Sequence, residues 1–496
     1  MTNHHLKWVK WAMCMLAVST WLTGPFSNAS QSANHTSKRS DAVAPTCVDN
    51  SPAVWFASPT GNDGSSNPHN HNIPMTFRGA AEAAQLGDKV CVMGGTYAQV
   101  QTFYPPRSGT PLAWIVYQAY GDGPANILWA ASGLHCPPEG TDDCTMINVN
   151  ALHGNSYLEF RGLNFDGRGL AGNAFACDNS HHLRYIGNTV FNVQGSGIGA
   201  VQCDYLTSDH NIVYHSGYSG TLASWTSGIS YNQIKAFDCN DGLHNVISNN
   251  IVVGQYDNSP NHSDGNAFIL DIDATPSGCA GTAAPYEPAA LIVNNVAYGN
   301  GGRCAEALQV SFFWMMANNT CFKNNLDNVN ANQANAASLD SNTASNGYFA
   351  NNISVSWQAS NPPYDQRNAN VNIQYFANLA WGAPCFADPS GADFCAKSPQ
   401  FIKADPTTVA PPYFDPSASG QYATAEPPFL LRNGLALQPG SPARCRGVDP
   451  TTLPGVPAQI AADMKNPSNV YFIYRNLNGN ARPCMGSCWD LGAYQH

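Results

Sequence analysis

Six charged side chains in the middle of the sequence have the types and spacing that catalysis or metal binding requires. They are Lys235, Asp264, Asp271, Asp273, Arg303 and Glu306. Only 11% of the residues are charged, against about a quarter in ordinary globular proteins, so a group of charges is informative. Asp271 falls within a strand-like segment, where aspartate is disfavoured, and this position indicates a functional carboxylate. Asp264 precedes Gly265 and Asn266, a sequence that is also typical of a turn.

Proton abstraction and metal binding are two kinds of chemistry that these residues support. A lysine or arginine acts as a base when burial or neighbouring cations favour its neutral form. Lys235 and Arg303 are the candidates, one as the base and the other as a ligand of a carboxylate. Oxygen ligands suit Ca²⁺, and Asp264, Asp271 and Asp273 are the candidate calcium ligands.

A pair of carboxylates supports a third kind of chemistry, the acid–base cleavage of a glycosidic bond. Asp271 and Glu306 fall on adjacent predicted strands, offset along them, and form the candidate pair. Aromatic and polar side chains beside these charges are candidates for substrate contacts, since aromatic rings stack on sugars and amides form hydrogen bonds with them. The candidate contacts are Trp225, Tyr231, Asn232, His262, Asn266 and Gln309.

The elements that must position these side chains follow from a repeat of short asparagine-led segments. The repeated residues are Asn188, Asn211, Asn250, Asn295, Asn319, Asn352 and Asn378. They are separated by 23, 39, 45, 24, 33 and 26 positions. The short gaps suit one coil of a stacked β-solenoid and the long gaps suit a coil with an inserted loop, so the sequence predicts a solenoid with one long shared surface.

Four strands of the predicted solenoid can be aligned by their local pattern, at 196–201, 227–232, 266–271 and 306–311. Because successive side chains of a strand alternate between its faces, the alignment predicts an inward apolar face and an outward polar one. The inward residues are Ile198, Ala200, Ile229, Tyr231, Phe268, Leu270, Leu308 and Val310. The outward residues, a polar wall across neighbouring coils, are Ser230, Asn232, Asp271, Gln309 and Ser311. A slip of one residue would exchange the two faces.

The two ends of the chain differ from the solenoid. Lys7 and Lys10 precede an apolar run at 11–21 and small residues at 27–29, which predicts a secretory signal over 1–29. Residues 30–52 are predicted to be a disordered leader. The segment 75–84 has helical periodicity and would cap the first coil. We expect the β-helix over 53–380, and a loop-rich tail packed on it over 381–496, where proline becomes frequent.

Charge and cysteine content restrict the partners and the compartment. The net charge is −11, and −13 without residues 1–29, which argues against nucleic acid and membrane partners. We expect a monomer that is exported to the periplasm or the extracellular medium. The 16 cysteines suit disulfides in such a compartment. The expected local pairs are Cys136 with Cys144, Cys385 with Cys395, and Cys484 with Cys488.

The sequence contains several further motifs, which are WFASPTGNDG at 55–64, GDKVCV at 87–92, GTY at 95–97, DGNAFILD at 264–271, NGGR at 300–303, GSPA at 440–443 and DLGAY at 490–494. They resemble those of secreted right-handed parallel β-helix proteins of the pectate-lyase-like superfamily. The resemblance covers about residues 53–496. It implies an all-β, right-handed parallel β-helix with a short N-terminal capping helix. The superfamily contains lyases, hydrolases, uronate epimerases and non-catalytic members, so the fold alone does not decide the reaction.

The leading functional hypothesis is a polysaccharide lyase that cleaves a uronate polymer such as pectate by β-elimination, with Ca²⁺ neutralising the uronate carboxylate. An Asp-Asp-Gly-Phe-Asp-like metal cluster, typical of one lyase group, is absent from the sequence. The first alternative is a glycoside hydrolase, since a neutral glycan would suit the acidic surface better. The second is a non-catalytic glycan-binding protein that uses tryptophan rings, for which the sequence offers Trp225, Trp314 and Trp357.

Overall fold

The computed structural model describes most of the chain after residue 45. The described residues are 46–131, 144–150, 155–217, 226–238, 240, 242–258, 262–274, 288–327, 336–356, 358, 360–382, 394–395, 398–402, 434–469, 471, 473–477, 482 and 488–494. In 273–274, 288, 365–367 and 394–395 only the backbone is described. The predicted signal over 1–29 lies outside the described residues. None of the described helices is long and apolar enough to cross a membrane.

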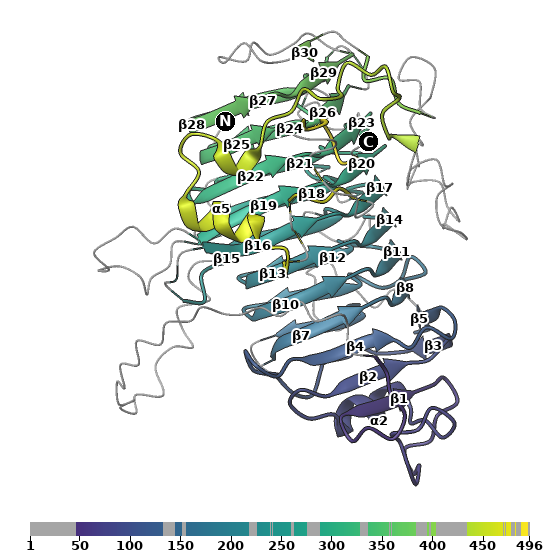
Figure 1. Ribbon diagram of the computed structural model, residues 1–496. Helices are drawn as coiled ribbons and strands as arrows, with labels where there is room; N and C mark the ends of the chain where they lie inside the picture. The colour runs from purple at the N-terminus through teal and green to yellow at the C-terminus, as the bar shows by residue number, and fades with distance from the viewer. Residues whose placement is uncertain are drawn as a thin grey trace, which may run out of the picture. The chain divides into compact units, whose positions relative to one another are not determined.

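The described strands form three all-parallel sheets, which stack as the coils of a right-handed parallel β-helix (Figure 1). Sheet A has eleven strands: β1 (Val54–Ala57), β2 (Lys89–Val92), β4 (Ile115–Ala119), β7 (Ser156–Arg161), β10 (His181–Ile186), β13 (Asp204–Asp209), β16 (Gly242–Ser248), β19 (Pro288–Val293), β22 (Phe313–Ala317), β25 (Ser345–Ala350) and β28 (Val371–Phe376). Sheet B has eleven: β3 (Gly95–Gln99), β5 (Ala125–Trp129), β8 (Asn164–Asp166), β11 (Thr189–Val193), β14 (Ile212–Ser216), β17 (Ile251–Gln255), β20 (Val296–Tyr298), β23 (Thr320–Phe322), β26 (Ile353–Val355), β29 (Leu379–Trp381) and β30 (Phe394–Cys395). Sheet C has eight: β6 (Ile147–Asn150), β9 (Phe175–Asp178), β12 (Ile198–Val201), β15 (Ile229–Lys235), β18 (Phe268–Ala274), β21 (Ala305–Leu308), β24 (Leu339–Asn342) and β27 (Tyr364–Arg367). The predicted fold class is confirmed.

The predicted asparagine repeat forms a buried ladder at the turn from sheet A to sheet B. The Oδ1 of each rung accepts two bonds from the preceding rung, from its backbone N–H at 2.8–3.0 Å and from its Nδ2 at 3.0–3.2 Å. All seven rungs are buried. The residue before each rung has a left-handed backbone, as at Asn294 (φ 59°) and Asn318 (φ 56°), a conformation that asparagine tolerates better than most residues.

The N-terminal end of the stack is covered by α2 (Phe77–Ala83), which packs on β1 and β2. Its N-cap is Thr76, whose hydroxyl accepts the Gly79 N–H. The predicted helix over 75–84 is confirmed, and the observed helix is slightly shorter than predicted at both ends. Part of the predicted disordered leader is ordered instead, because Cys47 forms a disulfide with Cys91 of β2 and the Asp49 carboxylate accepts from His71 at 2.7 Å.

The C-terminal segment lies along sheets A and B of the stack. In Figure 1, α5 (Ala458–Lys465) crosses sheet A near β16, where the Leu243 N–H donates to Asp463 at 3.4 Å. The short helix η4 (Pro450–Thr452) precedes it, and Tyr348 of β25 donates to the Pro454 carbonyl at 2.8 Å. Sheet B continues beyond residue 380 into β29 and β30, so the last strands extend past the expected boundary.

Four disulfides link described residues: Cys47–Cys91, Cys177–Cys203, Cys304–Cys321 and Cys445–Cys488. The predicted Cys484–Cys488 pair is wrong, because Cys488 is bonded to Cys445, 43 positions away. Cys144 is also disulfide-bonded. The other expected partners, Cys136 and Cys385, and the side chain of Cys395 lie outside the described residues. The observed bonds join segments that the coils bring together, which local spacing does not reveal.

Gly347 of β25 illustrates how tightly the coils pack. A Cβ at this position would lie 1.9 Å from the Trp314 ring, which is fully buried in the neighbouring coil. We expect Gly347→Ala to lower the free energy of unfolding by about 1–3 kcal/mol, because overpacking forces the ring from its position. Gly440→Ala is the control, since its nearest contact would be 3.8 Å away. Equal unfolding midpoints for the two variants would contradict this packing.

Candidate active site on the outward face of sheet C

The outward face of sheet C gathers the charged residues from four neighbouring coils. Backbone pairing aligns Ser230 with Ile269, Glu306 and Asp340 in one row. The next outward row, two residues further along each strand, contains Asn232, Asp271, Leu308 and Asn342. Glu306 and Asp271 therefore lie on adjacent strands, in adjacent rows of the same face.

The predicted register is confirmed for the first three aligned strands and is wrong for the fourth. Ile198, Ile229 and Phe268 pair as expected, but Phe268 pairs with Ala305 and not with Leu308. The shift of three residues is odd, so it exchanges the two faces of the strand. Glu306 consequently joins the outward face, and Leu308 leaves the inward one.

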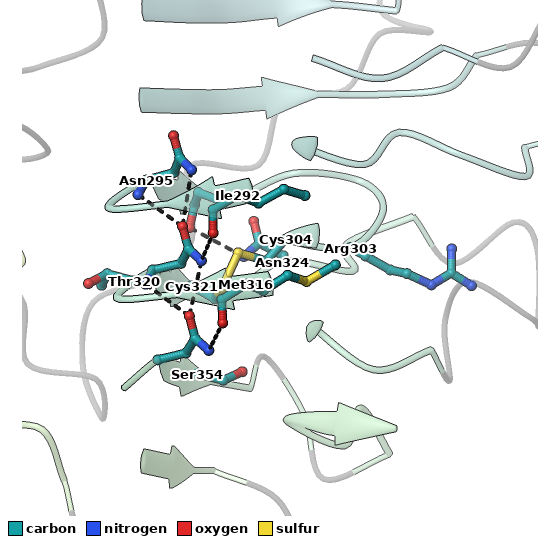
Figure 2. The surroundings of a disulfide bond; sticks show 12 residues. Ile292, Asn295, Arg303, Cys304, Met316, Thr320, Cys321, Asn324 and Ser354 are labelled. Atoms are coloured by element: carbon teal, nitrogen blue, oxygen red, sulfur yellow. Dashed lines mark hydrogen bonds between the residues drawn. A yellow bond between two sulfur atoms is a disulfide. The ribbon is translucent and has the colours of Figure 1, made fainter. Parts of the chain in front are cut away.

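Arg303 is the centre of the buried charges. Its Nη1 lies 3.2 Å from the Glu306 carboxylate and its Nε lies 2.8 Å from the Asp340 carboxylate. Figure 2 shows Arg303 directed away from the neighbouring Cys304–Cys321 disulfide of the interior. Burial disfavours its charge, but Glu306, Asp340 and Asp264 outweigh burial and hold the pKa of Arg303 above its ordinary value. Arg303 is 4% exposed and paired with two carboxylates, an arrangement that does not favour its predicted roles as a base or as the ligand of a substrate carboxylate.

Asp271 is an outward carboxyl group whose protonation is strongly altered. Burial, and secondly the nearby Glu306 carboxylate, raise the pKa of Asp271 to about 7. Its side chain retains a 7% exposed fraction, and no described residue donates a hydrogen bond to its buried Oδ1. The Oδ1 of Asn232, the residue paired with it on β15, likewise has no described donor. Asp271 is thus a carboxyl group that holds a proton near neutral pH beside unsatisfied acceptors.

Asp264 lies in the loop that leads into β18, above the same face. Burial, followed by the charges of Glu306, Asp257 and Asp271, raises the pKa of Asp264 well above its ordinary value, although Arg303 opposes this. The buried Asp257 carboxylate accepts the backbone N–H of Asp264 at 3.1 Å. With Asp340, five carboxyl groups of the described residues therefore lie in the region of Arg303, which favours protonation of some of them.

The expected calcium ligands are not assembled by the described side chains. Among described residues, no group of three or more Asp, Glu, His or Cys side chains is placed to hold a metal ion. The side chain of Asp273 lies outside the described residues, and its backbone pairs with Ile234. The described side chains alone do not supply such a group of ligands, and calcium, which takes six to eight oxygen ligands, stays a prediction.

Lys235 is the last described side chain of β15, and it extends toward an earlier coil, that of β9. Its side chain is exposed and its Nζ donates to the Asn179 Oδ1 at 3.2 Å. It lies three residues after Asn232, the neighbour of Asp271. The lysine is therefore available to an anion bound across sheet C, and no described contact buries it as a base would require.

Two predicted substrate contacts are wrong and three side chains remain available. Tyr231 is fully buried in the core, where its hydroxyl donates to Ser208 at 2.7 Å. Asn266 is also fully buried, and its amide bonds the Arg303 N–H and the Glu306 carboxylate. The available side chains are the half-buried Asn232 and His262 and the exposed Gln309. Trp225 and Trp357 lie outside the described residues, and Trp314 belongs to the core.

Several solved structures are similar to this chain. A pectate lyase, Pel9A, shares 17% identity over 90% of this chain and 98% of its own, with a TM-score of 0.49. An alginate lyase from a Paenibacillus strain shares 14% identity over 68% of this chain and 96% of its own, with a TM-score of 0.40. A rhamnogalacturonan lyase shares 13% identity over 66% of this chain and 73% of its own, with a TM-score of 0.35. No protein-family model and no curated protein sequence matches the chain. The likeness is one of fold, and the reaction must be argued from the side chains.

Besides Asp257, two charged residues near the face were not singled out from the sequence. Asp340 continues the row of Glu306 on β24, and extending the strand alignment by one coil to the segment LDSN at 339–342 would have found it. Asp327 lies 3.0 Å from the Nδ1 of His262, 65 positions away, and no local pattern marks it.

Replacing Arg303 by lysine tests its structural role. Arg303→Lys keeps the charge but cannot bridge Glu306 and Asp340 in the same geometry. We expect a loss of about 1–3 kcal/mol in the free energy of unfolding, measured by chemical denaturation. Arg168→Lys, at an exposed position, is the control and should change stability by less than about 0.5 kcal/mol. Equal stability of the two variants would mean that the ion pairs do not organise the site.

Proposed function

We propose that the protein is a polysaccharide lyase that cleaves a uronate polymer on the outward face of sheet C. The observation that carries the proposal is Asp271, an outward carboxyl group with a pKa raised to about 7 and a buried Oδ1 without a described donor. Protonated at neutral pH, it can give its proton to the glycosidic oxygen that departs. A stack of parallel coils presents this group on a long surface, which suits a polymer.

The charge of the substrate is the second consideration. A uronate carries a carboxylate next to the carbon that loses its proton, and a cation must offset that charge for elimination. Arg303 is buried and paired, so the exposed Lys235 is the cationic side chain of the original candidates that can contact the carboxylate. Asn232, between Lys235 and Asp271 on the same face, can donate its amide N–H to the substrate.

Hydrolysis of a glycosidic bond is the second candidate, favoured by the placement of Asp271 and Glu306 on adjacent strands. A hydrolase needs the second carboxylate to contact the sugar or a water molecule. Glu306 is instead 2% exposed and bonded to Arg303 and Asn266. This engagement makes hydrolysis the weaker candidate, although a neutral glycan would meet less repulsion from the acidic carboxyl groups.

Calcium and export are separate proposals. A bound Ca²⁺ would neutralise the uronate carboxylate, and Asp264, Asp271 and Asp273 were the ligands expected to hold it. The disulfides of the described chain are typical of exported proteins, in agreement with the signal predicted over 1–29. Unchanged activity in excess EDTA would remove calcium from the reaction, and would leave the role of Asp271 unaffected.

The products distinguish the two reactions. The purified chain would be incubated with pectate, alginate and neutral glycans, with and without EDTA, and the products followed by ultraviolet absorbance and reducing-end assay. Elimination gives an unsaturated, absorbing uronate at the new end, whereas hydrolysis gives new reducing ends without absorbance. Absorbing product from at least one uronate polymer is the expected result. Cleavage without it would replace the lyase by the hydrolase, and binding without cleavage would support a glycan-binding protein.

Replacing Lys235 tests the proposed contact with the substrate carboxylate. We expect Lys235→Met to lower kcat/KM on the polymer by about 10- to 100-fold, mostly through KM, because a charge-assisted hydrogen bond is lost. Lys465→Met, an exposed lysine of α5 on the other side of the stack, is the control. Equal activity of the two variants would show that Lys235 does not contact the substrate.

A further inference from the structure

His262 and Asp327 form a dyad that the preceding account of the site leaves without a role. The Nδ1 of His262 lies 3.0 Å from the Asp327 carboxylate. The Asp327 side chain is 1% exposed, whereas the His262 side chain is 19% exposed. The Tyr256 ring contacts the imidazole edge to face, with 6.0 Å between centroids. The aspartate is thus fixed inside the protein, and the histidine reaches the surface.

The dyad lies on the loops that lead into the active-site strands. His262 is followed by Ser263 and Asp264, whose backbone N–H groups both donate to the Asp257 carboxylate, at 2.9 and 3.1 Å. On the other loop, the Asp327 N–H donates to the Gly301 carbonyl at 2.9 Å.

A backbone bond joins the loop of His262 to the loop before β21, which also contains the Gly301 that accepts from Asp327. The Gly302 N–H donates to the Gly265 carbonyl at 2.9 Å. A Cβ on Gly302 would lie 2.3 Å from the Asp264 carbonyl oxygen, and Gly265 has a φ of +77°. Glycine is required at both positions for this close approach. The dyad is therefore held next to Asp264 and Arg303, at the entrance to β18 and β21.

The hydrogen bond determines which nitrogen of His262 can accept a proton. A carboxylate beside Nδ1 holds the imidazole proton there, which leaves the Nε2 lone pair as the acceptor. Within the described part of the chain, Nε2 has no hydrogen-bond partner. A buried carboxylate that orients a surface histidine is the arrangement by which enzymes position a general base.

We propose that His262 is the general base that removes the C5 proton of the uronate, and that Asp327 is the residue that positions its ring. The inference rests on the proposed β-elimination and names the base that this reaction lacked. Lys235 is exposed and Arg303 is held charged by two carboxylates, so neither of the two cationic candidates supplies a base.

The step balances without a further reactant. Nε2 takes the proton from C5, and the electrons of the C5–H bond form the C4–C5 double bond. The C4–O bond breaks, its electrons go to the departing glycosidic oxygen, and that oxygen takes the proton of Asp271. His262 then carries one extra proton and Asp271 lacks one, and exchange with water restores both.

The test compares the full chain with His262→Ala, Asp327→Asn and the double variant, using the rate of unsaturated product. We expect His262→Ala to lower kcat by about 10²- to 10⁴-fold with a small change in KM. Added imidazole should restore part of the rate to this variant and none to Asp271→Asn. Asp327→Asn should also lower kcat, and the double variant should be no slower than His262→Ala, because both changes remove one catalytic unit.

His210→Ala is the matched control. His210 is also paired with an aspartate, since its Nδ1 lies 2.6 Å from the Asp209 carboxylate, but it follows a strand of sheet A. Its removal should leave kcat unchanged. Thermal unfolding of every variant establishes that the fold is retained.

Each result decides between the proposals. If the wild type produces unsaturated product and His262→Ala is equally fast, the base assignment is wrong and the lyase proposal stands. A folded but slow His262→Ala that imidazole does not accelerate also overturns the assignment, because the histidine then acts structurally. If the wild type produces no unsaturated product from any uronate, both proposals fail together.

Discussion

Asp271→Asn is expected to slow cleavage strongly and to stabilise the protein. Asparagine has nearly the same shape but cannot donate a carboxyl proton, so the rate should fall by about 10²- to 10⁴-fold. The pKa of Asp271 is raised from its ordinary value to about 7, so ionising it in the folded state opposes folding. That opposition is fully present above pH 7, decreases as the pH falls, and vanishes below the ordinary aspartate pKa. The variant should therefore raise the midpoint of thermal unfolding more at pH 8 than at pH 5.

The pH dependence of the wild-type rate provides a second measurement. Because Asp271 must be protonated to donate, kcat/KM should decline as the pH rises through about 7. Asp178→Asn is the control, since Asp178 occupies the same lateral row of sheet C on β9 and is exposed. The role of Asp271 is excluded if Asp271→Asn cleaves as fast as this control. A uniform stability change at pH 5 and pH 8 would show that the carboxyl group is not forced to remain neutral.

Asn319→Ala should produce the largest loss of stability among the substitutions considered. Asn319 accepts from the backbone and the side chain of Asn295, at 2.9 and 3.1 Å, and donates to the Ile292 carbonyl at 2.8 Å. Its Nδ2 also donates to the next rung, Asn352, at 3.0 Å. All these groups are buried, and each one left without a partner costs about 1–3 kcal/mol. We expect the free energy of unfolding to fall by at least about 3 kcal/mol.

Asn346→Ala is the control, because it removes an asparagine amide that is exposed and not part of the buried ladder. Asn346 lies on the exposed face of β25, where its Nδ2 donates to the Ser311 carbonyl at 3.0 Å. We expect its removal to change stability by less than about 1 kcal/mol. Denaturant unfolding followed by circular dichroism measures both variants. Similar midpoints would show that the buried ladder contributes no more than a surface hydrogen bond.

The fold could be predicted because its main signal is repeated at seven successive A-to-B turns, from Asn188 to Asn378. A buried asparagine at such a turn must find the same partners each time, so the same residue recurs there. The first three strands of sheet C were aligned correctly because their inward residues, such as Ile198 and Phe268, are large and apolar. In β21 the inward positions are Ala305 and Ala307, the smallest apolar side chains. The larger Leu308 and Val310 look more like the inward residues of the other strands, and the alignment therefore placed β21 in the wrong register.

The positions of the candidate residues on sheet C could be predicted from the sequence, and their contacts only in part. Asp271 was singled out because a carboxyl group within a strand is unusual. The burial of Arg303 depends on Asp340, 37 positions away, and the orientation of His262 depends on Asp327. Such partners become neighbours only when coils stack, and the length of each loop sets which residues meet. The sequence offers no local pattern from which those two contacts could be calculated.

The asparagine ladder also indicates how such a protein can change its chemistry. Successive rungs make the same bonds whether 23 residues separate them, as between Asn188 and Asn211, or 45, as between Asn250 and Asn295. The hydrogen bonds between rungs therefore do not depend on the length of the segment inserted between them. The two longest insertions contain Lys235, His262 and Asp271, so the candidate catalytic residues lie in segments whose length the ladder does not restrict. A coil bounded by two rungs is therefore the segment to exchange if this surface is to bind a different substrate.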